Sequence, residues 1–294
     1  MEDKTENVQA AKINWFPGHM TKARRMIAEN VKIVDAVCEI IDARIPLSSR
    51  NPDLDELTGS KPRLVIMNKV DMADPERTRK WAEWFKAQGK FVLETDCKSG
   101  KGTAAFTSAV RSMLREKLEQ YAAKGQTGRQ LRVMVVGIPN VGKSTFINKI
   151  AKRRAAEISD RPGVTRGKQW INIDKGLELL DTPGILWPKF DSQEVGEHLA
   201  YTGAIRDQVV DVEALAASLF ALLRDFYPDR IEARYKFAPP AEASGYELLS
   251  LAGKKRGFLI SGGEIDTERM ANILLDEFRA GKLGRITLEL PPEN

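Results

Sequence analysis

The chain has 294 residues, of which 42% are hydrophobic and 30% charged, so it can bury the core of one large or two ordinary globular domains. Its apolar runs are too short to span a membrane, and its polar, acidic first residues do not match a secretory signal. Two cysteines, Cys38 and Cys97, are too few for a disulfide framework. We therefore expect a cytoplasmic protein that has no membrane partner.

In chain order, residues 1–12 are predicted to be disordered, and a loop then leads into a basic helix that ends near Asn30. Short apolar runs rich in β-branched residues predict strands, and segments 75–90 and 107–124 predict helices between them. Strands that alternate with helices are typical of an α/β fold with a doubly wound, mostly parallel sheet. The predicted strands are 36–42, 63–68, 91–95, 131–137, 170–173 and 177–181.

The pattern changes near residue 188. Residues 195–236 and 267–280 carry apolar side chains at helical spacing, whereas the intervening FAPPAEASG and KKRGFLISGGEID segments are typical of loops. We predict an α/β domain over residues 1–190 and a smaller, mainly helical C-terminal domain over residues 191–294.

The charge is positive overall but unevenly distributed. The net charge is +5, with −4 in residues 195–294 and +9 in the remainder. A basic body suits a polyanionic partner such as RNA, because phosphate contacts dominate that kind of binding, although solubility alone also explains the excess. The basic stretches that are candidate contacts to an RNA backbone are 22–32, 152–154 and 254–256.

A phosphate-binding loop follows the predicted strand at 131–137. The residues from Gly137 to Ser144 form G-x-x-x-x-G-K-S between a strand and an apolar helix start, the context in which this motif binds nucleotide phosphates. The glycines let successive backbone N–H groups face the phosphates, and the positive end of the helix dipole adds to the attraction. Lys143 is placed to reach the β- and γ-phosphates, and the Ser144 hydroxyl is placed to ligate Mg²⁺.

A second motif, Asn68-Lys-Val-Asp71, suits a guanine base. Guanine presents two adjacent donors, N1–H and N2–H₂, and the Asp71 carboxylate can accept both at once. The motif follows a strand, at the sheet edge where open α/β proteins bind ligands. We expect Asn68 to bridge backbone and base and the Lys69 stem to cover the base. N-K-x-D alone is also a common surface turn, and the phosphate loop in the same chain favours the guanine-binding interpretation.

The order of the motifs resembles that of the circularly permuted GTPases. Asn68–Asp71 comes before Gly137–Ser144, which is followed by Thr165 and by Asp181-Thr-Pro-Gly184. Within that class the chain resembles the ribosome biogenesis GTPase A (YlqF-like) family over nearly its whole length. The segments that also carry this resemblance are WFPGHM (15–20), DARIPLSSRNP (42–52) and DTPGILWPKF (181–190).

The resemblance implies a P-loop GTPase fold with circularly permuted strand order. One departure is Asp96-Cys97-Lys98, where GTPases usually have Ser-Ala-Lys; we expect little loss, because that motif acts mostly through its backbone. Permutation also joins Gly184 directly to the C-terminal domain, so nucleotide state can move that domain. The predicted nucleotide contacts are Asn68, Lys69, Asp71, Cys97, Lys98, Asn140, Val141, Gly142, Lys143, Ser144, Thr145 and Gly184.

The same resemblance and the chain order assign metal ligands. Thr165 is expected to complete the Mg²⁺ shell when GTP orders its loop, Asp181 to hold the metal through water, and the Gly184 N–H to sense the γ-phosphate. The predicted magnesium ligands are Ser144, Thr165 and Asp181. Asn140 resembles the residue that helps to bind K⁺ in potassium-dependent GTPases; an ordinary turn asparagine is the alternative interpretation.

The position after Gly184 raises a question about catalysis. Many GTPases have a glutamine there that orients the attacking water, but Ile185 cannot form a hydrogen bond. In the family that the chain resembles, the histidine matching His19 is implicated in catalysis, and a neutral imidazole can position water. The alternative is a loop histidine that supports folding or binds RNA phosphate. The predicted catalytic residues are His19, Lys143 and Thr165.

Family resemblance implies a molecular switch with GTP or GDP, Mg²⁺ and K⁺ as ligands. Its implied partner is the large ribosomal subunit or its precursor, contacted by the C-terminal domain in the GTP state during late assembly. Hydrolysis is expected to be slow alone and stimulated on the particle, and the protein to be a monomer. Two alternatives remain at this point: a GTPase of another structured RNA or RNA-modification system, and a signalling or trafficking switch. The second would usually carry a lipidation signal or membrane helix.

Overall fold

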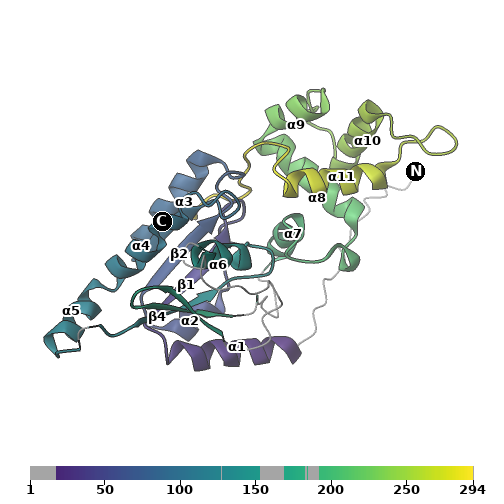
Figure 1. Ribbon diagram of the computed structural model, residues 1–294. Coiled ribbons are helices and arrows are strands. Elements are labelled where there is room, and N and C mark those ends of the chain that lie inside the picture. Colours follow the sequence, from purple (N-terminus) through teal and green to yellow (C-terminus); the bar gives the residue numbers. More distant parts are fainter. Residues whose placement is uncertain (1–17, 127, 153–168, 183, 185–191, 294) are drawn as a thin grey trace. The chain divides into compact units, whose positions relative to one another are not determined.

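The computed structural model describes residues 18–126, 128–152, 169–182, 184 and 192–293, which form two compact units (Figure 1). The first unit contains the described residues up to 184 together with residues 285–293, and the second contains residues 192–284. The disorder predicted for residues 1–12 lies outside the described residues. Within the described part of the chain, no helix has both the length and the apolar character needed to cross a bilayer.

A six-stranded sheet in the order β3-β2-β1-β4-β6-β5 forms the centre of the first unit. All neighbouring strands are parallel except β5, which runs antiparallel to β6. This confirms the predicted doubly wound, mostly parallel sheet. The strands are β1 (Ala36–Asp42), β2 (Arg63–Asn68), β3 (Phe91–Thr95), β4 (Leu131–Val136), β5 (Gln169–Asp174) and β6 (Leu177–Asp181).

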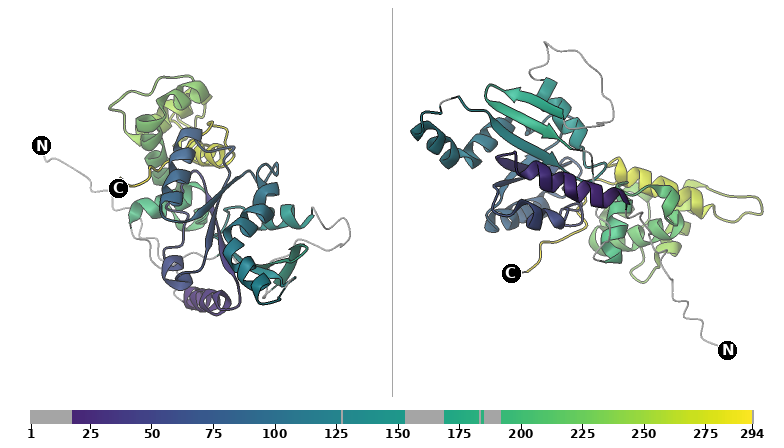
Figure 2. Two further views of the ribbon diagram at one scale, coloured as in Figure 1. Left: turned by 90° about the vertical axis from the view of Figure 1, so that its left-hand side faces the viewer. Right: turned by 90° about the horizontal axis from the view of Figure 1, so that it is seen from below.

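Helices cover both faces of this sheet, because alternate side chains of a strand point to opposite faces (Figures 1 and 2). On one face, helices α1 (Gly18–Val31) and α2 (Asp53–Thr58) pack on β4 and β6. On the other, the Trp81 and Phe85 side chains of α3 (Pro75–Ala87) pack on β1 and β2. The remaining helices of this unit are α4 (Phe106–Met113), α5 (Arg115–Ala123) and α6 (Lys143–Lys152), with a short 3₁₀ turn η1 (Thr103–Ala105).

Two helical features differ from the sequence prediction. The helix expected over 107–124 is two helices, α4 and α5, because Leu114 between them leaves the helical conformation with φ −104° and ψ 17°. In the second unit, the helix α10 (Gly245–Arg256) was not predicted. The start of α10 could have been predicted from the sequence, because Ser244 and Glu247 form a reciprocal capping box, whose sequence pattern is S-x-x-E.

The second unit is mainly helical and has its own core. Its longest helix, α8, packs against α9, α10 and α11, and buried Leu219, Phe220 and Leu274 contribute to the shared core. The elements of this unit are α7 (Gln193–Tyr201), η2 (Asp207–Val209), α8 (Val212–Phe226), α9 (Pro228–Tyr235), α10 and α11 (Thr267–Arg279).

The last residues of the chain return to the first unit, so the helical unit ends at residue 284 and not at the predicted 294. The backbone N–H of Ile286 donates to the Met72 carbonyl oxygen at 2.9 Å, and that of Leu288 donates to the Arg44 carbonyl oxygen at 2.8 Å. Both apolar side chains are buried, which explains why this segment leaves the helical unit.

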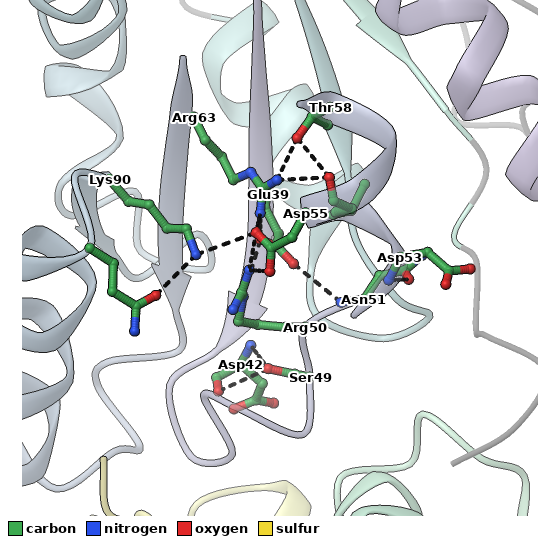
Figure 3. Close-up of polar contacts among 12 residues, drawn as sticks. Glu39, Asp42, Ser49, Arg50, Asn51, Asp53, Asp55, Thr58, Arg63 and Lys90 are labelled. Carbon is green, nitrogen blue, oxygen red and sulfur yellow. Dashed lines mark hydrogen bonds and ion pairs between the residues drawn. The ribbon is translucent and has the colours of Figure 1, made fainter. Parts of the chain in front are cut away.

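A buried polar network holds the loop that follows β1 (Figure 3). Glu39 is 1% exposed, and its Oε1 accepts a hydrogen bond from the backbone N–H of Asn51 at 3.2 Å. Its Oε2 lies 3.4 Å from Nε of Arg50 and 3.7 Å from Nη1 of Arg63. Arg63 also pairs with Asp55 at 2.6 Å. The network therefore ties the loop and α2 to the sheet through the buried charges of Glu39, Arg50 and Arg63 and through Asp55 of α2, whose side chain is 56% exposed.

We expect Glu39→Ala to destabilise the first unit by about 3 kcal/mol, because it leaves the buried Arg50 and Arg63 without one of their counter-charges. The matched control is Glu83→Ala in the exposed pair with Arg79 at 3.3 Å, which should cost less than about 1 kcal/mol. Urea unfolding followed by tryptophan fluorescence would measure both. Equal losses in the two variants would contradict the role given to the buried network.

Candidate functional site

The phosphate-binding loop joins β4 to α6 at the carboxyl edge of the sheet. Two of its backbone positions have positive φ, +63° at Asn140 and +94° at Gly142, and α6 then begins at Lys143. The side chains of Ser144 and Thr145 in the first turn of α6 are exposed. The first-turn N–H groups of a helix have no partner within the helix, so this turn can receive phosphate oxygens.

The side chain of Asn68 joins three of the predicted motifs. Its Nδ2 donates to the Val141 carbonyl oxygen of the phosphate loop at 2.7 Å. Its Oδ1 accepts from the Cys97 backbone N–H at 3.0 Å and from the Thr95 hydroxyl at 3.3 Å. Since Asn68 is buried, with 2% exposure, these bonds are not competed for by water. The amide thus sets the spacing between the base-binding loops and the phosphate loop.

Lys69 makes a second connection to the phosphate loop. Its Nζ donates to the Asn140 carbonyl oxygen at 2.7 Å and lies 2.9 Å from Oδ2 of Asp42, at the end of β1. Asp42 is also paired with Arg44 at 2.8 Å. Burial by itself raises the pKa of Asp42, but the charges of Arg44 and Lys69 outweigh it and hold this pKa well below the usual carboxyl range. Asp42 is therefore an anion that orients Lys69.

The remaining predicted base contacts lie on two loops. Asp71 and Lys98 are exposed, so their side chains are accessible to a ligand. Cys97 is 2% exposed, and burial raises its pKa to about 11, so it remains a neutral thiol. The loop that carries Cys97 and Lys98 is held by Asp96, whose Oδ1 accepts from the backbone N–H of Lys98 at 2.9 Å and of Ser99 at 3.2 Å.

The end of β6 lies beside the phosphate loop. Asp181 pairs with Lys143 through an Oδ1–Nζ distance of 2.5 Å, and each residue is 7% exposed. The Thr182 hydroxyl donates to the Val135 carbonyl oxygen at 2.7 Å. A Cβ added at Gly184 would lie 3.3 Å from the backbone nitrogen of Pro139, so this glycine closely approaches the loop. Two hard oxygen ligands that suit Mg²⁺, the Asp181 carboxylate and the exposed Ser144 hydroxyl, thus belong to adjoining segments.

Two predicted catalytic residues are not placed by these contacts. His19 lies in the first turn of α1, but its side chain is outside the described part of the structure. Thr165 lies outside the described residues altogether. Their roles stay predictions.

Asp42 is a site residue that the motif search missed. The sequence feature that could have identified it is a carboxylate at the carboxyl end of the mostly apolar strand β1, which lies between β2 and β4, the strands that lead into the base motif and the phosphate loop. Its partner Lys69 could not be inferred from sequence spacing, because only the parallel pairing of β1 with β2 brings Asp42 opposite Asn68.

Comparison with known proteins decides the family. Residues 132–230 match a family model described as 50S ribosome-binding GTPase. The chain is 47% identical to ribosome biogenesis GTPase A of Bacillus cereus over 281 residues, which cover 96% of this chain and 95% of that protein. The chain belongs to the ribosome biogenesis GTPase A family. It is therefore a GTPase that acts in ribosome biogenesis, binds guanine nucleotide and hydrolyses GTP.

Solved structures support the permuted fold of this ribosome biogenesis GTPase. GNP-bound YlqF from Thermotoga maritima matches with a TM-score of 0.66 at 30% identity, covering 93% of this chain and 100% of that chain. A GDP-bound YlqF structure matches with a TM-score of 0.64 at 31% identity, covering 92% and 100%. The base motif on β2 precedes the phosphate loop after β4 in this fold, as the permutation predicts.

Gly142 offers a direct test of the contact between Asn68 and the phosphate loop. A Cβ at Gly142 would lie 2.3 Å from Nδ2 of Asn68, so Gly142→Ala should displace this amide and weaken GDP binding by about tenfold or more. Gly128→Ala is the matched control: its φ is +89° and nothing lies within 4 Å of an added Cβ. Fluorescent GDP titration would measure both, and equal affinities would show that this contact does not organise the site.

Proposed function

We propose that this GTPase acts in late assembly of the large ribosomal subunit, as a cytoplasmic monomer that binds the pre-ribosomal particle in its GTP state and leaves after hydrolysis. The observation that carries the proposal is the near full-length similarity to ribosome biogenesis GTPase A, together with the 50S-binding description of the matched family model. The net charge of +9 outside residues 195–294 suits ribosomal RNA as the surface that is bound. The helical unit is a further proposed particle-binding element; because residues 195–294 carry a net charge of −4, its contacts would not rest on overall charge, and the basic first unit would supply the contacts to the RNA backbone.

We further propose that the loops at the carboxyl edge of the sheet hold the nucleotide. Asp71 would accept the two donors of guanine, and Lys69, already held by Asp42 and by the Asn140 carbonyl, would lie along the base. Lys143 would leave Asp181 for the β- and γ-phosphates. Asp181 would then be released to hold Mg²⁺ through water, so neither buried charge would lose its counter-charge.

The proposed magnesium ligands are Ser144, Thr165 and Asp181, and the bound Mg²⁺ would supply positive charge to the phosphate oxygens. Gly184, which closely approaches the phosphate loop, would donate its N–H to the γ-phosphate. Asn140 is exposed at a positive φ and is the proposed K⁺ contact. His19 is the proposed residue that positions the attacking water, because Ile185 cannot.

The assembly proposal predicts slow GTP hydrolysis by the isolated protein and a stimulation of about tenfold or more by large ribosomal subunits in K⁺ buffer, corresponding to about 1.4 kcal/mol of transition-state stabilisation. Phosphate release would be measured with large subunits, with their precursors, and with small subunits as control. His19→Ala should bind GTP normally but lose the stimulation. Equal stimulation by small subunits, or none by large subunits and precursors, would contradict the proposed partner.

The base assignment predicts that Asp71→Asn lowers GTP affinity by about 100-fold, because two charge-assisted hydrogen bonds are lost, and raises affinity for xanthosine triphosphate. Xanthine carries a carbonyl where guanine has its amino group, and an asparagine N–H can donate to it. Competition binding with both nucleotides would measure the change, and xanthine binding serves as an internal control for folding. Unchanged GTP affinity would remove Asp71 from the base site.

A further inference from the structure

The C-terminal segment 285–289 lies against the two loops that follow β1 and β2. Thr287 is fully buried, and its hydroxyl accepts a hydrogen bond from the backbone N–H of Asp74 at 3.1 Å while donating to the Ala43 carbonyl oxygen at 3.1 Å. Its own carbonyl oxygen accepts from Nη1 of Arg77 at 2.7 Å. One hydroxyl therefore joins the loop after β1 to the start of α3.

The residues on either side of Thr287 extend this connection. The N–H of Ile286 donates to the carbonyl oxygen of Met72, the residue directly after Asp71. The N–H of Leu288 donates to the carbonyl oxygen of Arg44. The backbone of the segment thus bonds to both loops, through Ile286 to the loop after β2 and through Leu288 to the loop after β1. The loop that carries Asp71 is held at Met72 and again at Asp74.

Glu289 anchors the end of the segment. Its carboxylate accepts hydrogen bonds from the backbone N–H groups of Leu47 at 2.6 Å and Ser48 at 3.0 Å, and from the Ser48 hydroxyl. Its carbonyl oxygen accepts from the Trp81 Nε1–H at 3.2 Å. Glu289 is 9% exposed, so these contacts are shielded from water and fix the segment on the first unit.

The contacts continue from this segment to the nucleotide loops. Arg44, whose carbonyl receives Leu288, donates from its backbone N–H and from Nε to Oδ1 of Asp42, each at 3.0 Å. Asp42 in turn pairs with Lys69, whose Nζ bonds to the Asn140 carbonyl of the phosphate loop. A continuous set of bonds thus runs from the C-terminal segment to the phosphate loop; it is buried at Arg44 and Asp42 and exposed at its last link, from Lys69 to Asn140.

We propose that residues 285–289 are a positioning element of the guanine site and hold the Asp71 loop in place through the bonds at Met72 and Asp74. Guanine affinity and selectivity therefore depend on this C-terminal segment. This inference rests on the proposed role of Asp71 in reading the base. The loop of Cys97 and Lys98 holds itself through Asp96, whereas the Asp71 loop takes two of its backbone bonds, at Met72 and Asp74, from the C-terminal segment.

The test uses the full chain with Thr287→Val, which keeps the shape of the side chain but removes the bridging hydroxyl. Affinities for GDP and for inosine diphosphate, which lacks the 2-amino group of guanine, are measured well below the melting temperature. We expect GDP affinity to fall about fivefold, the value of one net hydrogen bond, and the preference for GDP over inosine diphosphate to fall with it. Thr287→Ser should restore both.

The matched control is Thr58→Val. Thr58 is also buried, donates to the Leu54 carbonyl oxygen at 2.6 Å and accepts from Arg63, but it belongs to the network of Glu39. It should lower the melting temperature without changing the preference for GDP. A second pair of variants leaves the buried hydroxyl in place. Glu289→Gln should lower the preference for GDP over inosine diphosphate, whereas Glu293→Gln, at an exposed residue, should leave it unchanged.

Asp71→Asn, measured in parallel, separates the two hypotheses. If Asp71→Asn leaves the preference for guanine intact, the proposed base reader fails. If Asp71→Asn abolishes that preference while Thr287→Val and Glu289→Gln behave like their controls, the base reader stands and the role of the C-terminal segment is overturned. If Asp71→Asn and Thr287→Val both lose the preference for GDP over inosine diphosphate, and Thr287→Ser keeps it, the positioning role is supported.

Discussion

The candidate nucleotide site of this protein is organised around the buried amide of Asn68. One side chain bonds simultaneously to its neighbouring base loop and to the phosphate loop, 73 residues further along the chain. An amide has a donor end and an acceptor end, and here both are satisfied inside the protein, where an unmade hydrogen bond is costly. The same contact requires that Gly142 has no Cβ, because an added Cβ would lie 2.3 Å from Nδ2 of the Asn68 amide.

Charge in the site is organised as close pairs. Asp42 with Lys69 and Arg44, and Lys143 with Asp181, lie largely out of water, where isolated charges would be strongly unfavourable. In the proposed binding mode, a phosphate would take the place of the Asp181 carboxylate beside Lys143, and a metal ion would take the place of the Lys143 ammonium group beside Asp181.

The permuted order of the chain gives the helical unit an unusual connection. At one end it continues from the segment after Asp181-Thr-Pro-Gly184, and at the other it leads into residues 285–293, which bond to the loops after β1 and β2. Both ends of this unit are thus covalently joined to parts of the nucleotide site. In a GTPase whose motifs stand in the usual order, a domain appended after the last strand would lack the first of these connections.

The sequence by itself determined those parts of this protein that depend on residues close together in the chain. The six strands and the phosphate loop were predicted from apolar periodicity and glycine geometry, and the guanine motif was predicted from the match between the Asp71 carboxylate and the donors of guanine; each of these features involves only a few consecutive residues. Only the tertiary structure decided the bonds between distant segments: Asn68 to Val141, Asp42 to Lys69 and Thr287 to Asp74. It also placed residues 285–293 on the first unit. Such contacts follow from strand order and burial, which bring chemically ordinary side chains together at distances that no sequence spacing encodes.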